Sequence, residues 1–564
     1  MARGGSERSV GRMNTISMSR PARDCQVLVV GAGPTGLVLA AELLSRGIRT
    51  RIIDQGDGVA LQARAIGIHA RTLEVLAMMG LAEQFLADGQ VVRHMRFYSE
   101  GRCLTSLGFA HNGSRFGFML MLPQDQTERL LRARVTELGG VVENRTELAG
   151  LEVCDGDVTA AVRAPNGEPE TITAGYAVGC DGAHSRVRRE LGATFYGHPY
   201  PQDWLLADVL LNWDLSEDAT HAFFRRDGLP VILFPMRGHR WRLTLPFAGD
   251  RDAQSPPTLE EIQRLTDQRA PRPVTVSDPS WLACFRSHRR SASAYRRGPV
   301  LLAGDAVHIH SPAGGQGLNT GIMEAHNLGW KLALVAAGRA PDALLDTYGA
   351  ERQPVAEEVL RLTHALVHYG TLTQPVRRRA RDAVVPALGL SPVIQRRAAR
   401  RMSQVYVSYP PGPLVRRNRE RGHPRPGQRM PDLQVRAGGQ ATTLYDVLRG
   451  GRHVLVTPAT DVASALNDPA LRPFRSELDV VTPTPEPRDQ GAGPFILIRP
   501  DGHVAALGRP GRTDAVTGYL RDLFTTPARD PDKGNEGRSE HHFERSTLRR
   551  QSPEERKCSK MRWA

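Results

Sequence analysis

Cysteine is scarce in this sequence of 564 residues. Six cysteines occur, at positions 25, 103, 154, 180, 284 and 558, and no two of them have the CxxC spacing of a zinc or redox site. So few thiols exclude a disulfide-stapled scaffold and indicate a reduced, cytoplasmic location. The same scattered spacing predicts that the chain binds no metal ion.

Lysine is rarer still, because only four of the 74 basic residues are lysines. An arginine-rich chain with 55 glycines and 40 prolines is typical of a GC-rich bacterial genome. The formal net charge of +14 could indicate a nucleic-acid partner, but fourteen arginines and only two acids lie between residues 377 and 429. Only two tyrosines accompany these arginines as stacking platforms. We therefore interpret this segment as a solvated helix face and a linker, and predict no nucleic-acid partner.

Long hydrophobic runs are also missing. The most apolar early segment, residues 27–44, is interrupted by Gly31, Gly33, Pro34 and Gly36, which a membrane-spanning helix rarely carries together. The first twenty residues lack the apolar core of a secretory signal. We therefore predict no membrane partner. Hydrophobic residues still make up 40% of the chain, enough for the cores of three or four domains.

The glycine-interrupted segment lies inside a predicted β-α-β unit. Residues 26–30 (QVLVV) have the pattern of a buried strand, residues 37–46 that of a helix, and residues 50–53 that of a second strand. Asp54 follows the second strand, eighteen residues after the last glycine of a GxGxxG motif. This order is typical of a dinucleotide-binding fold.

Each glycine of that motif has a physical role. Gly31 allows the tight turn, Gly33 lets the backbone approach a pyrophosphate, and Gly36 permits close packing of helix and strand. The N-terminus of the helix, which also contains Thr35, offers unpaired N–H groups to the phosphates. The motif predicts a bound dinucleotide, but it does not distinguish FAD from a nicotinamide.

Two distant glycine-containing segments narrow the choice. They are residues 178–188 (VGCDGAHSRVR) and residues 300–320 (VLLAGDAVHIHSPAGGQGLNT). Residues 300–303 predict another buried strand, and Asp305 follows its carboxyl end, where open α/β sheets bind ligands. The loop then opens a predicted helix over residues 318–337, whose positive N-terminus can face an anionic ring edge.

Together these three segments resemble those of the single-component FAD-dependent aromatic hydroxylases (class A flavoprotein monooxygenases). More narrowly, they are similar to the bacterial aromatic-polyketide hydroxylases and the rifampicin-type monooxygenases. The resemblance covers about residues 25–366. It implies an α/β fold with a Rossmann-like FAD-binding domain, an inserted mixed β-sheet substrate domain and a thioredoxin-like C-terminal domain.

We divide the chain accordingly. The expected parts are a disordered tail (1–24), the first part of the FAD-binding domain (25–194), the substrate-binding sheet domain (195–285), the second part of the FAD-binding domain (286–370), a helical and Pro/Arg-rich linker (371–429), the thioredoxin-like domain (430–526) and a second disordered tail (527–564).

The resemblance also assigns residues to the site. Asp54 becomes the ligand of the FAD ribose, Asp305 the contact to the ribityl chain, Arg64 a flavin contact with a catalytic role, and Gln124 a contact to the ribityl or phosphate region. By the same resemblance, the DGxxSxxR pattern at residues 181–188 is expected to help bind both FAD and the nicotinamide pyrophosphate, and the loop before the long helix to frame the isoalloxazine. The further cofactor-binding residues are Gly31, Gly33, Thr35, Gly36, Gln55, Asp181, Gly182, Ser185, Arg188, Gly304, Gly315, Gly317, Leu318 and Asn319.

The implied reaction is aromatic hydroxylation. NAD(P)H reduces FAD, O₂ adds to give a C4a-hydroperoxyflavin, and its distal OH is transferred to an aromatic substrate such as a polyketide or antibiotic. The expected partners are this aromatic small molecule and O₂, and a homodimer is left open. Two alternatives stay open: Baeyer–Villiger oxygen insertion on a similar polycyclic substrate, and a non-catalytic FAD-binding interaction protein. A flavin halogenase would need a GWxWxIP segment and a flavin disulfide reductase a CxxxxC motif, and the sequence has neither.

Other conspicuous residues have ordinary interpretations. His308 and His310 are expected to be structural or to border the flavin, since no metal-ligand set surrounds them in the sequence. Trp330 and Leu332 are expected in the core. Alternating apolar and aromatic runs predict further strands at residues 221–224, 231–235, 241–247, 453–457 and 495–498.

Overall fold

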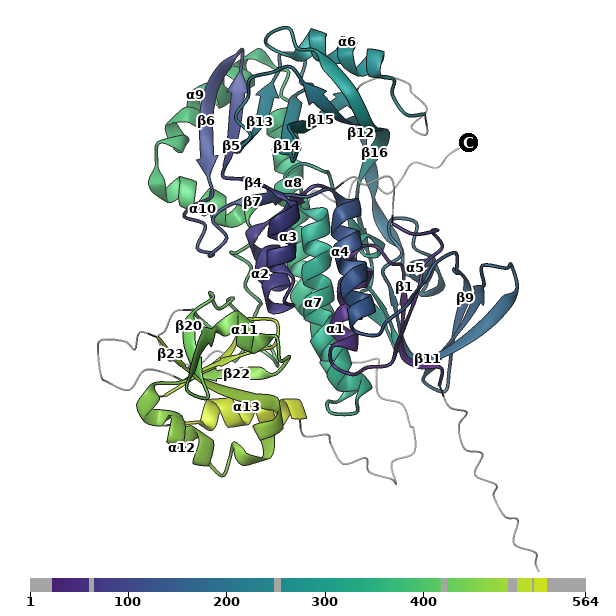
Figure 1. The fold of residues 1–564 in the computed structure, drawn as a ribbon, viewed down its shortest axis with the longest axis vertical. Coiled ribbons are helices and arrows are strands. Elements are labelled where there is room, and N and C mark those ends of the chain that lie inside the picture. Colours follow the sequence, from purple (N-terminus) through teal and green to yellow (C-terminus); the bar gives the residue numbers. More distant parts are fainter. Residues whose placement is uncertain are drawn as a thin grey trace, which may run out of the picture. The chain divides into compact units, whose positions relative to one another are not determined.

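The structure is a computed structural model that describes residues 23–59, 65–247, 255–416, 424–484, 495–509 and 512–524 (Figure 1). Arg64 and the two predicted tails lie outside the described residues, except that Arg23 and Asp24 are described. Asp24 accepts a hydrogen bond from the amide of Thr173 at 2.7 Å. No helix in the described part of the chain is long and apolar enough to cross a membrane.

The first eight-stranded sheet carries the dinucleotide motif. Its strands follow the order β17-β18-β11-β1-β2-β8, and β10 and β9 extend from β11. The bounds are β1 Cys25–Val30, β2 Thr50–Ile53, β8 Val142–Glu143, β9 Glu147–Cys154, β10 Asp157–Arg163, β11 Pro169–Gly179, β17 Arg296–Arg297 and β18 Val300–Leu302. β1 pairs in parallel with β2 and β11, and β11 pairs in parallel with β18, so the three motifs end at the same edge of the sheet.

Three helices pack together beside this sheet. They are α1 (Pro34–Leu44), α4 (Gln124–Glu137) and α7 (Gly317–Ala336), and α1 packs against both of the others. The predicted strands and helices of the three motifs are confirmed. α1 begins three residues before the predicted start, because proline is tolerated in the first turn of a helix. Trp330 and Leu332 of α7 are both buried, as predicted.

The second eight-stranded sheet has the order β19-β16-β12-β15-β14-β13-β5-β6. Its bounds are β5 His94–Ser99, β6 Arg102–Gly108, β12 Phe195–Leu211, β13 Ala219–Phe224, β14 Val231–Met236, β15 Arg240–Phe247, β16 Val276–Ala292 and β19 His308–Ile309. The three strands predicted between residues 221 and 247 are confirmed. The β5–β6 hairpin was not foreseen, although Glu100 and Gly101, both at positive φ, form the kind of two-residue turn that joins hairpin strands.

A small third sheet and further helices accompany the two larger sheets. A three-stranded sheet consists of β3 Gly67–Ile68, β4 Gln90–Val92 and β7 Met119–Met121. The remaining helices before residue 410 are α2 Ala70–Met78, α3 Ala82–Asp88, α5 Arg186–Glu190, α6 Leu259–Arg269, α8 Asp346–Gly370, α9 Pro375–Gly389, α10 Pro392–Met402, and the 3-10 helices η1 Gly304–Ala306 and η2 Asp342–Leu345.

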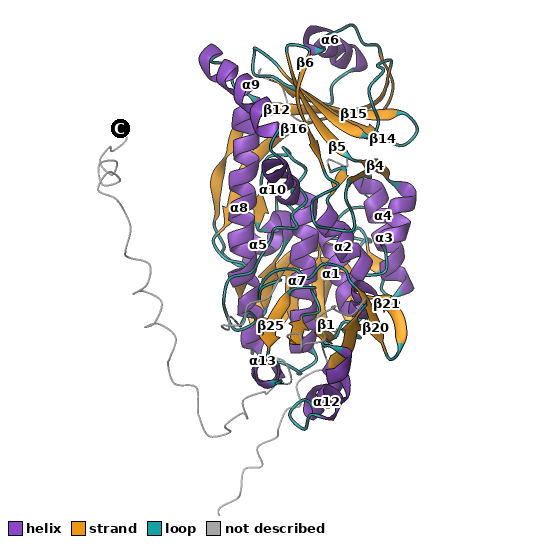
Figure 2. Ribbon diagram, turned by 90° about the vertical axis from the view of Figure 1, so that its left-hand side faces the viewer, coloured by secondary structure: helices purple, strands orange, loops and turns teal. Residues whose placement is uncertain are grey.

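The arginine-rich segment packs against the second sheet through α9 and α10, which both contact β6 (Figure 2). Arg381 lies over the ring of Phe224 at 4.3 Å, and Asp382 accepts a hydrogen bond from Ser99 at 2.7 Å. Several of its other arginines form ion pairs: Arg401 with Glu358, Arg416 with Asp522, and Arg429 with Glu74. The interpretation as a solvated face and linker is therefore incomplete, because part of the segment is packed and paired.

The C-terminal part forms a six-stranded sheet of order β21-β20-β23-β22-β24-β25. Its elements are β20 Gln434–Ala437, β21 Gln440–Thr443, α11 Leu444–Leu448, β22 His453–Val456, η3 Ala459–Asp461, α12 Val462–Asn467, η4 Arg472–Glu477, β23 Leu478–Pro483, β24 Phe495–Ile498, β25 Val504–Gly508 and α13 Asp514–Phe524. The two predicted strands, β22 and β24, are confirmed. Its likeness to thioredoxin stays a prediction.

Candidate active site

The turn between β1 and α1 is shaped for a phosphate. Gly31 has φ +102°, and a Cβ there would lie 2.5 Å from the carbonyl oxygen of Cys180. A Cβ on Gly36 would lie 1.9 Å from the carbonyl oxygen of Gly31. Gly33 differs, because a Cβ there would meet no atom within 4 Å. The N-terminus of α1, which has no side-chain cap, therefore borders open space that an anionic group can enter.

Asp54 lies beside this turn at the end of β2. Its carboxylate accepts hydrogen bonds from the amides of Ala32 at 2.6 Å and Gly56 at 2.7 Å. It is half-buried, whereas the neighbouring Gln55 is exposed. Asp54 thus helps to hold the glycine turn in place, and its predicted contact to the ribose stays a prediction.

The DGxxSxxR segment forms the start of α5. The carboxylate of Asp181 accepts hydrogen bonds from the first two amides of that helix at 2.6 and 3.1 Å, and Ser185 Oγ accepts one from the amide of Arg188 at 2.9 Å. The Arg188 guanidinium donates to the carbonyl of Ala306 at 3.0 Å and stacks over Phe195 at 3.9 Å. Ser185 is fully buried, so its visible role is to cap the helix, while Arg188 fixes α5 to the segment that carries Asp305.

A buried glutamate fixes the turn before Asp305. Glu324 on α7 accepts hydrogen bonds from the amide of Gly304 at 2.9 Å and from His308 Nε2 at 2.8 Å. Gly304 has φ +64°, and a Cβ there would lie 2.7 Å from Thr35 Oγ1. Burial lowers the pKa of His308 and the Glu324 carboxylate raises it, with a net rise. This arrangement presents the exposed Asp305 toward the space in front of the turn.

Asn319 organises the loop of residues 314–319, which we call the flavin loop. Its amide donates to the carbonyls of Gly67 at 2.8 Å and Gly315 at 2.7 Å. Its Oδ1 accepts from the amide of His69 at 2.8 Å and from Thr72 Oγ1 at 2.7 Å. Because Asn319 is fully buried and makes four hydrogen bonds within the protein, it acts as part of the frame and not as a surface contact.

A cavity of about 830 Å³ lies between the flavin loop and the second sheet. The β-sheet wall is mainly apolar and includes Met95, Phe97, Leu107, Trp204, Leu206, Ala222, Phe224, Ile232, Phe234 and Phe285. Residues of α9 and α10, among them Leu388 and Ile394, complete this wall. Of the predicted site residues, the cavity is lined by Gly33, Thr35, Gln124, Gly182, Asp305, Gly315, Gly317 and Leu318. The structure therefore brings residues of all three motifs to one space.

Two arginines in the cavity wall were not foreseen from the sequence. Arg242 forms a bidentate pair with Asp208, both contacts being 2.7 Å, and Arg286 pairs with Asp203 at 2.7 and 2.9 Å. Arg242 also donates to the carbonyl of Ala65 at 3.2 Å, next to the segment that contains Arg64. No spacing in the sequence marks these pairs, because β12 meets β15 and β16 only in the folded sheet.

Among the described residues, no group of three or more His, Cys, Asp and Glu side chains could hold a metal ion. Cys180 is a small buried residue, as expected, and its burial raises the pKa of the thiol.

The described residues fit FAD. The open space at Gly33, the uncapped N-terminus of α1 and the cavity in front of α7 are what an extended dinucleotide with a tricyclic ring requires.

The fold and this site define a flavin-dependent oxidoreductase of the aromatic-hydroxylase type. A family model for the FAD binding domain matches residues 24–363, and one for the C-terminal domain of aromatic-ring hydroxylases matches residues 423–527. The chain is 36% identical to a 6-methylpretetramide 4-monooxygenase of Streptomyces rimosus over 89% of this chain and 94% of that protein. It is 35% identical to a rifampicin monooxygenase of Streptomyces venezuelae, with 86% of this chain and 95% of that protein covered.

A solved structure shows the same architecture. The anhydrotetracycline hydroxylase from Streptomyces rimosus superimposes with a TM-score of 0.75 at 34% identity, covering 89% of this chain and all of that one. The chain belongs to the family of FAD-dependent aromatic-ring hydroxylases. It is a flavoprotein monooxygenase with FAD as its cofactor, and NAD(P)H is the electron donor typical of this family.

Acidification is expected to lower the free energy of unfolding through two buried histidines beside the flavin loop. Burial lowers the pKa of His69 to about 4, and burial together with the neighbouring His308 lowers the pKa of His310 to about 4. His69 Nε2 lies 2.9 Å from the carbonyl oxygen of Gly314, and His310 lines the cavity. Between pH 6.5 and 4 the unfolded chain binds protons that the folded chain does not, so stability falls as the pH falls, by up to about 3 kcal/mol per histidine.

Urea unfolding at pH 7, 6 and 5, with bound FAD measured in parallel, checks this expectation. The His69→Gln/His310→Gln double variant should lose less stability over this range than the unsubstituted protein. An equal loss in both proteins would contradict it.

Proposed function

We propose that this monooxygenase hydroxylates a polycyclic phenolic compound, of the polyketide or antibiotic class on which its relatives act. The observation that carries this proposal is the cavity of about 830 Å³, which is bounded by the flavin loop on one side and by an aromatic and aliphatic sheet wall on the other. The part of this cavity beside the flavin loop would hold the flavin ring, and the part beside the sheet wall is apolar, which favours the burial of fused aromatic rings next to it.

We also propose which residues hold FAD. The amides of the Gly31–Gly36 turn and the N-terminus of α1 bind the pyrophosphate, Asp54 binds the ribose, and Asp305 binds the ribityl chain. Gln55, Asp181, Gly182, Ser185, Arg188, Gln124 and Arg64 keep their assignments from the sequence as proposals. When bound, FAD supplies the redox chemistry by which a hydride from NAD(P)H and a molecule of O₂ yield an oxygen atom for the aromatic ring.

The protein's own groups prepare the substrate and the site. The positive N-terminus of α7, at Gly317, stabilises negative charge on a ring lying against the flavin loop. The apolar wall keeps water from the reacting atoms. Arg242 and Arg286 in the cavity wall are each paired with a carboxylate, Asp208 and Asp203, so these two pairs bring no net charge to the cavity. The hydroxyl group of a phenolic substrate donates electrons to the ring, and this activates the ring carbon that accepts the oxygen atom.

Filling the cavity tests this function. Ala222 is buried and lines the cavity on β13, so Ala222→Trp should leave bound FAD unchanged while it blocks the substrate. With a tetracyclic phenol as probe, we expect the stimulation of NAD(P)H oxidation to fall at least a hundredfold. If the variant is stimulated as strongly as the unsubstituted protein, the cavity is not the substrate site. If no polycyclic phenol stimulates the unsubstituted protein, the proposed substrate class is wrong.

We also propose a cytoplasmic location and a homodimer. The free thiols at positions 25, 103, 154, 180 and 284 support a reducing compartment.

The homodimer is supported by exposed apolar side chains on and beside α9 and α10, such as Val376 at 77% and Leu390 at 85%, which a second copy of the chain could cover. Light scattering on the purified protein decides between monomer and dimer.

A further inference from the structure

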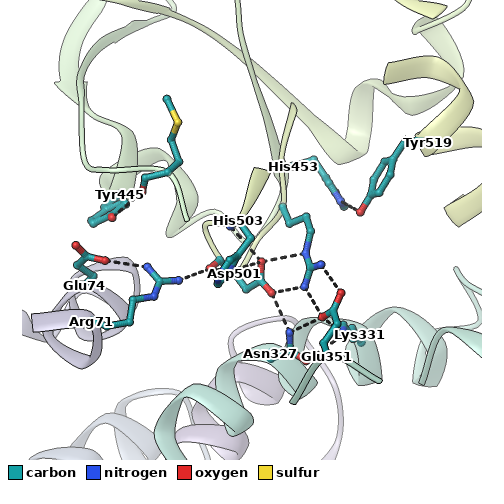
Figure 3. Close-up of polar contacts among 12 residues, drawn as sticks. Arg71, Glu74, Asn327, Lys331, Glu351, Tyr445, His453, Asp501, His503 and Tyr519 are labelled. Atoms are coloured by element: carbon teal, nitrogen blue, oxygen red, sulfur yellow. Dashed lines mark hydrogen bonds and ion pairs between the residues drawn. The ribbon is translucent and has the colours of Figure 1, made fainter. Parts of the chain in front are cut away.

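A buried network of charged side chains joins the C-terminal sheet to the helices of the FAD-binding domain (Figure 3). Its centre is Arg499, in the turn between β24 and β25. The Arg499 guanidinium donates to both oxygens of Glu351 on α8, at 2.6 and 2.9 Å. Lys331 Nζ on α7 donates to the same carboxylate at 2.7 Å. Arg499 and Lys331 have no exposed surface, and Glu351 has only 4%.

Asp501 extends the network to two further helices. Its carboxylate accepts a hydrogen bond from Asn327 Nδ2 on α7 at 3.1 Å. Its backbone carbonyl accepts one from Arg71 Nη2 on α2 at 2.8 Å. A Cβ on the neighbouring Gly502 would lie 3.1 Å from Met78 Sδ of α2, so the turn is packed closely against this helix. One turn of the C-terminal domain therefore contacts α2, α7 and α8.

The first turn of α2 connects this network to the flavin loop. Arg71 donates a hydrogen bond to the carbonyl of Asp501, in the turn of residues 499–503. The next residue, Thr72, donates one to Asn319 Oδ1 at 2.7 Å. The amide of His69, just before α2, donates to the same Asn319 oxygen, and His69 Nε2 lies 2.9 Å from the carbonyl oxygen of Gly314. A displacement of the first turn of α2 would therefore move the partners that hold the flavin loop.

We propose that the turn of residues 499–503 is a positioning element for FAD. It fixes the first turn of α2 and the middle of α7, and thereby the flavin loop between them. Burying so many charges gains little stability compared with an apolar interface, so the value of the network lies in the placement it imposes. Arg71, Asn327 and Asp501 are the positioning residues. The proposal rests on the proposed function in one respect, that the flavin loop holds the isoalloxazine ring.

The test compares both ends of α2. Arg71→Met removes the hydrogen bond from α2 to the turn of residues 499–503. Glu74 of α2 keeps an ion pair, because Arg429 lies 2.9 Å from its carboxylate. Arg449→Met is the matched control, because Arg449 also reaches α2 from the C-terminal domain, but at the last turn, where it donates to the carbonyl of Ala77 at 3.0 Å. The measurements are the FAD dissociation constant of the apoprotein, by flavin fluorescence, and the visible circular dichroism of the bound flavin.

We expect Arg71→Met to raise the FAD dissociation constant at least tenfold and to change the flavin dichroism. Arg71→Lys should restore part of the affinity, and Arg449→Met should change neither quantity. Asn327→Leu removes the hydrogen bond between α7 and Asp501. We expect it to raise the FAD dissociation constant in the same way, and it replaces Arg71→Met if that variant does not fold. A dissociation constant within twofold of the unsubstituted value in the variants that fold would overturn the proposal.

Asp305→Ala separates this proposal from the assignment of the FAD site. If Asp305→Ala loses FAD while Arg71→Met and Asn327→Leu retain it, the positioning role is wrong and the site stands. If Asp305→Ala also retains FAD with unchanged affinity, the assignment of the site itself is wrong.

Discussion

Gly33→Ala is expected to produce a stable protein that no longer retains FAD. Gly33 has no positive φ and a Cβ there would meet no protein atom within 4 Å, so the apoprotein should melt within about 2 °C of the unsubstituted apoprotein. The methyl group would instead occupy the open space before α1 that the pyrophosphate needs. We expect the FAD dissociation constant to rise at least a hundredfold, measured by titration of the apoprotein.

Gly36→Ala is the informative contrast to Gly33→Ala. A Cβ at Gly36 would lie 1.9 Å from the carbonyl oxygen of Gly31, so this variant should be unstable even without FAD. The same added methyl group thus separates a glycine needed for the ligand from one needed for the fold. If Gly33→Ala bound FAD as tightly as the unsubstituted protein, the phosphate would not approach this turn.

Glu351→Ala is expected to lower the free energy of unfolding by about 3–5 kcal/mol. Burial raises the pKa of Glu351, but the neighbouring Arg499 and Lys331 lower it by more, to about 2, so the carboxylate is charged at neutral pH. Its removal leaves the buried cations Arg499 and Lys331 without their shared partner. Urea unfolding of the apoprotein measures the change, provided that the m-value stays constant.

Arg339→Met serves as the control for that measurement. Arg339 pairs with Glu477 of the C-terminal domain, but its side chain is 48% exposed, so its loss should cost less than about 1 kcal/mol. Similar losses for Glu351→Ala and Arg339→Met would contradict the account of a buried network.

The strands and helices of the three glycine-containing motifs are predicted well from the sequence because their signals are local. Gly31 and Gly36 answer steric requirements set by the backbone of Cys180 and by the turn itself, whereas Gly33 leaves open space in front of α1. The roles of Glu324 and Arg242 could not be predicted in this way, because each acts on a segment brought close only by folding. The contact of Arg71 with Asp501 joins residues 430 positions apart.

The arginine-rich segment shows a different limit. Its composition indicated a solvated linker, since arginines outnumber acids there by fourteen to two. In the structure, Leu388 and Ile394 of this segment line the cavity, and Arg381 stacks on Phe224. The arginine-rich composition predicts only the solvated face of α9 and α10. Which residues of these helices are packed depends on the sheet that they contact, and the sheet forms only on folding.

The most direct test of the account is turnover of a polycyclic phenol by the purified, yellow protein with NAD(P)H under isotopically labelled O₂. We predict a hydroxylated product that carries one labelled oxygen atom per molecule, formed only when flavin and substrate are both present. A product without the label, or NAD(P)H oxidation that no polycyclic phenol stimulates, would contradict it.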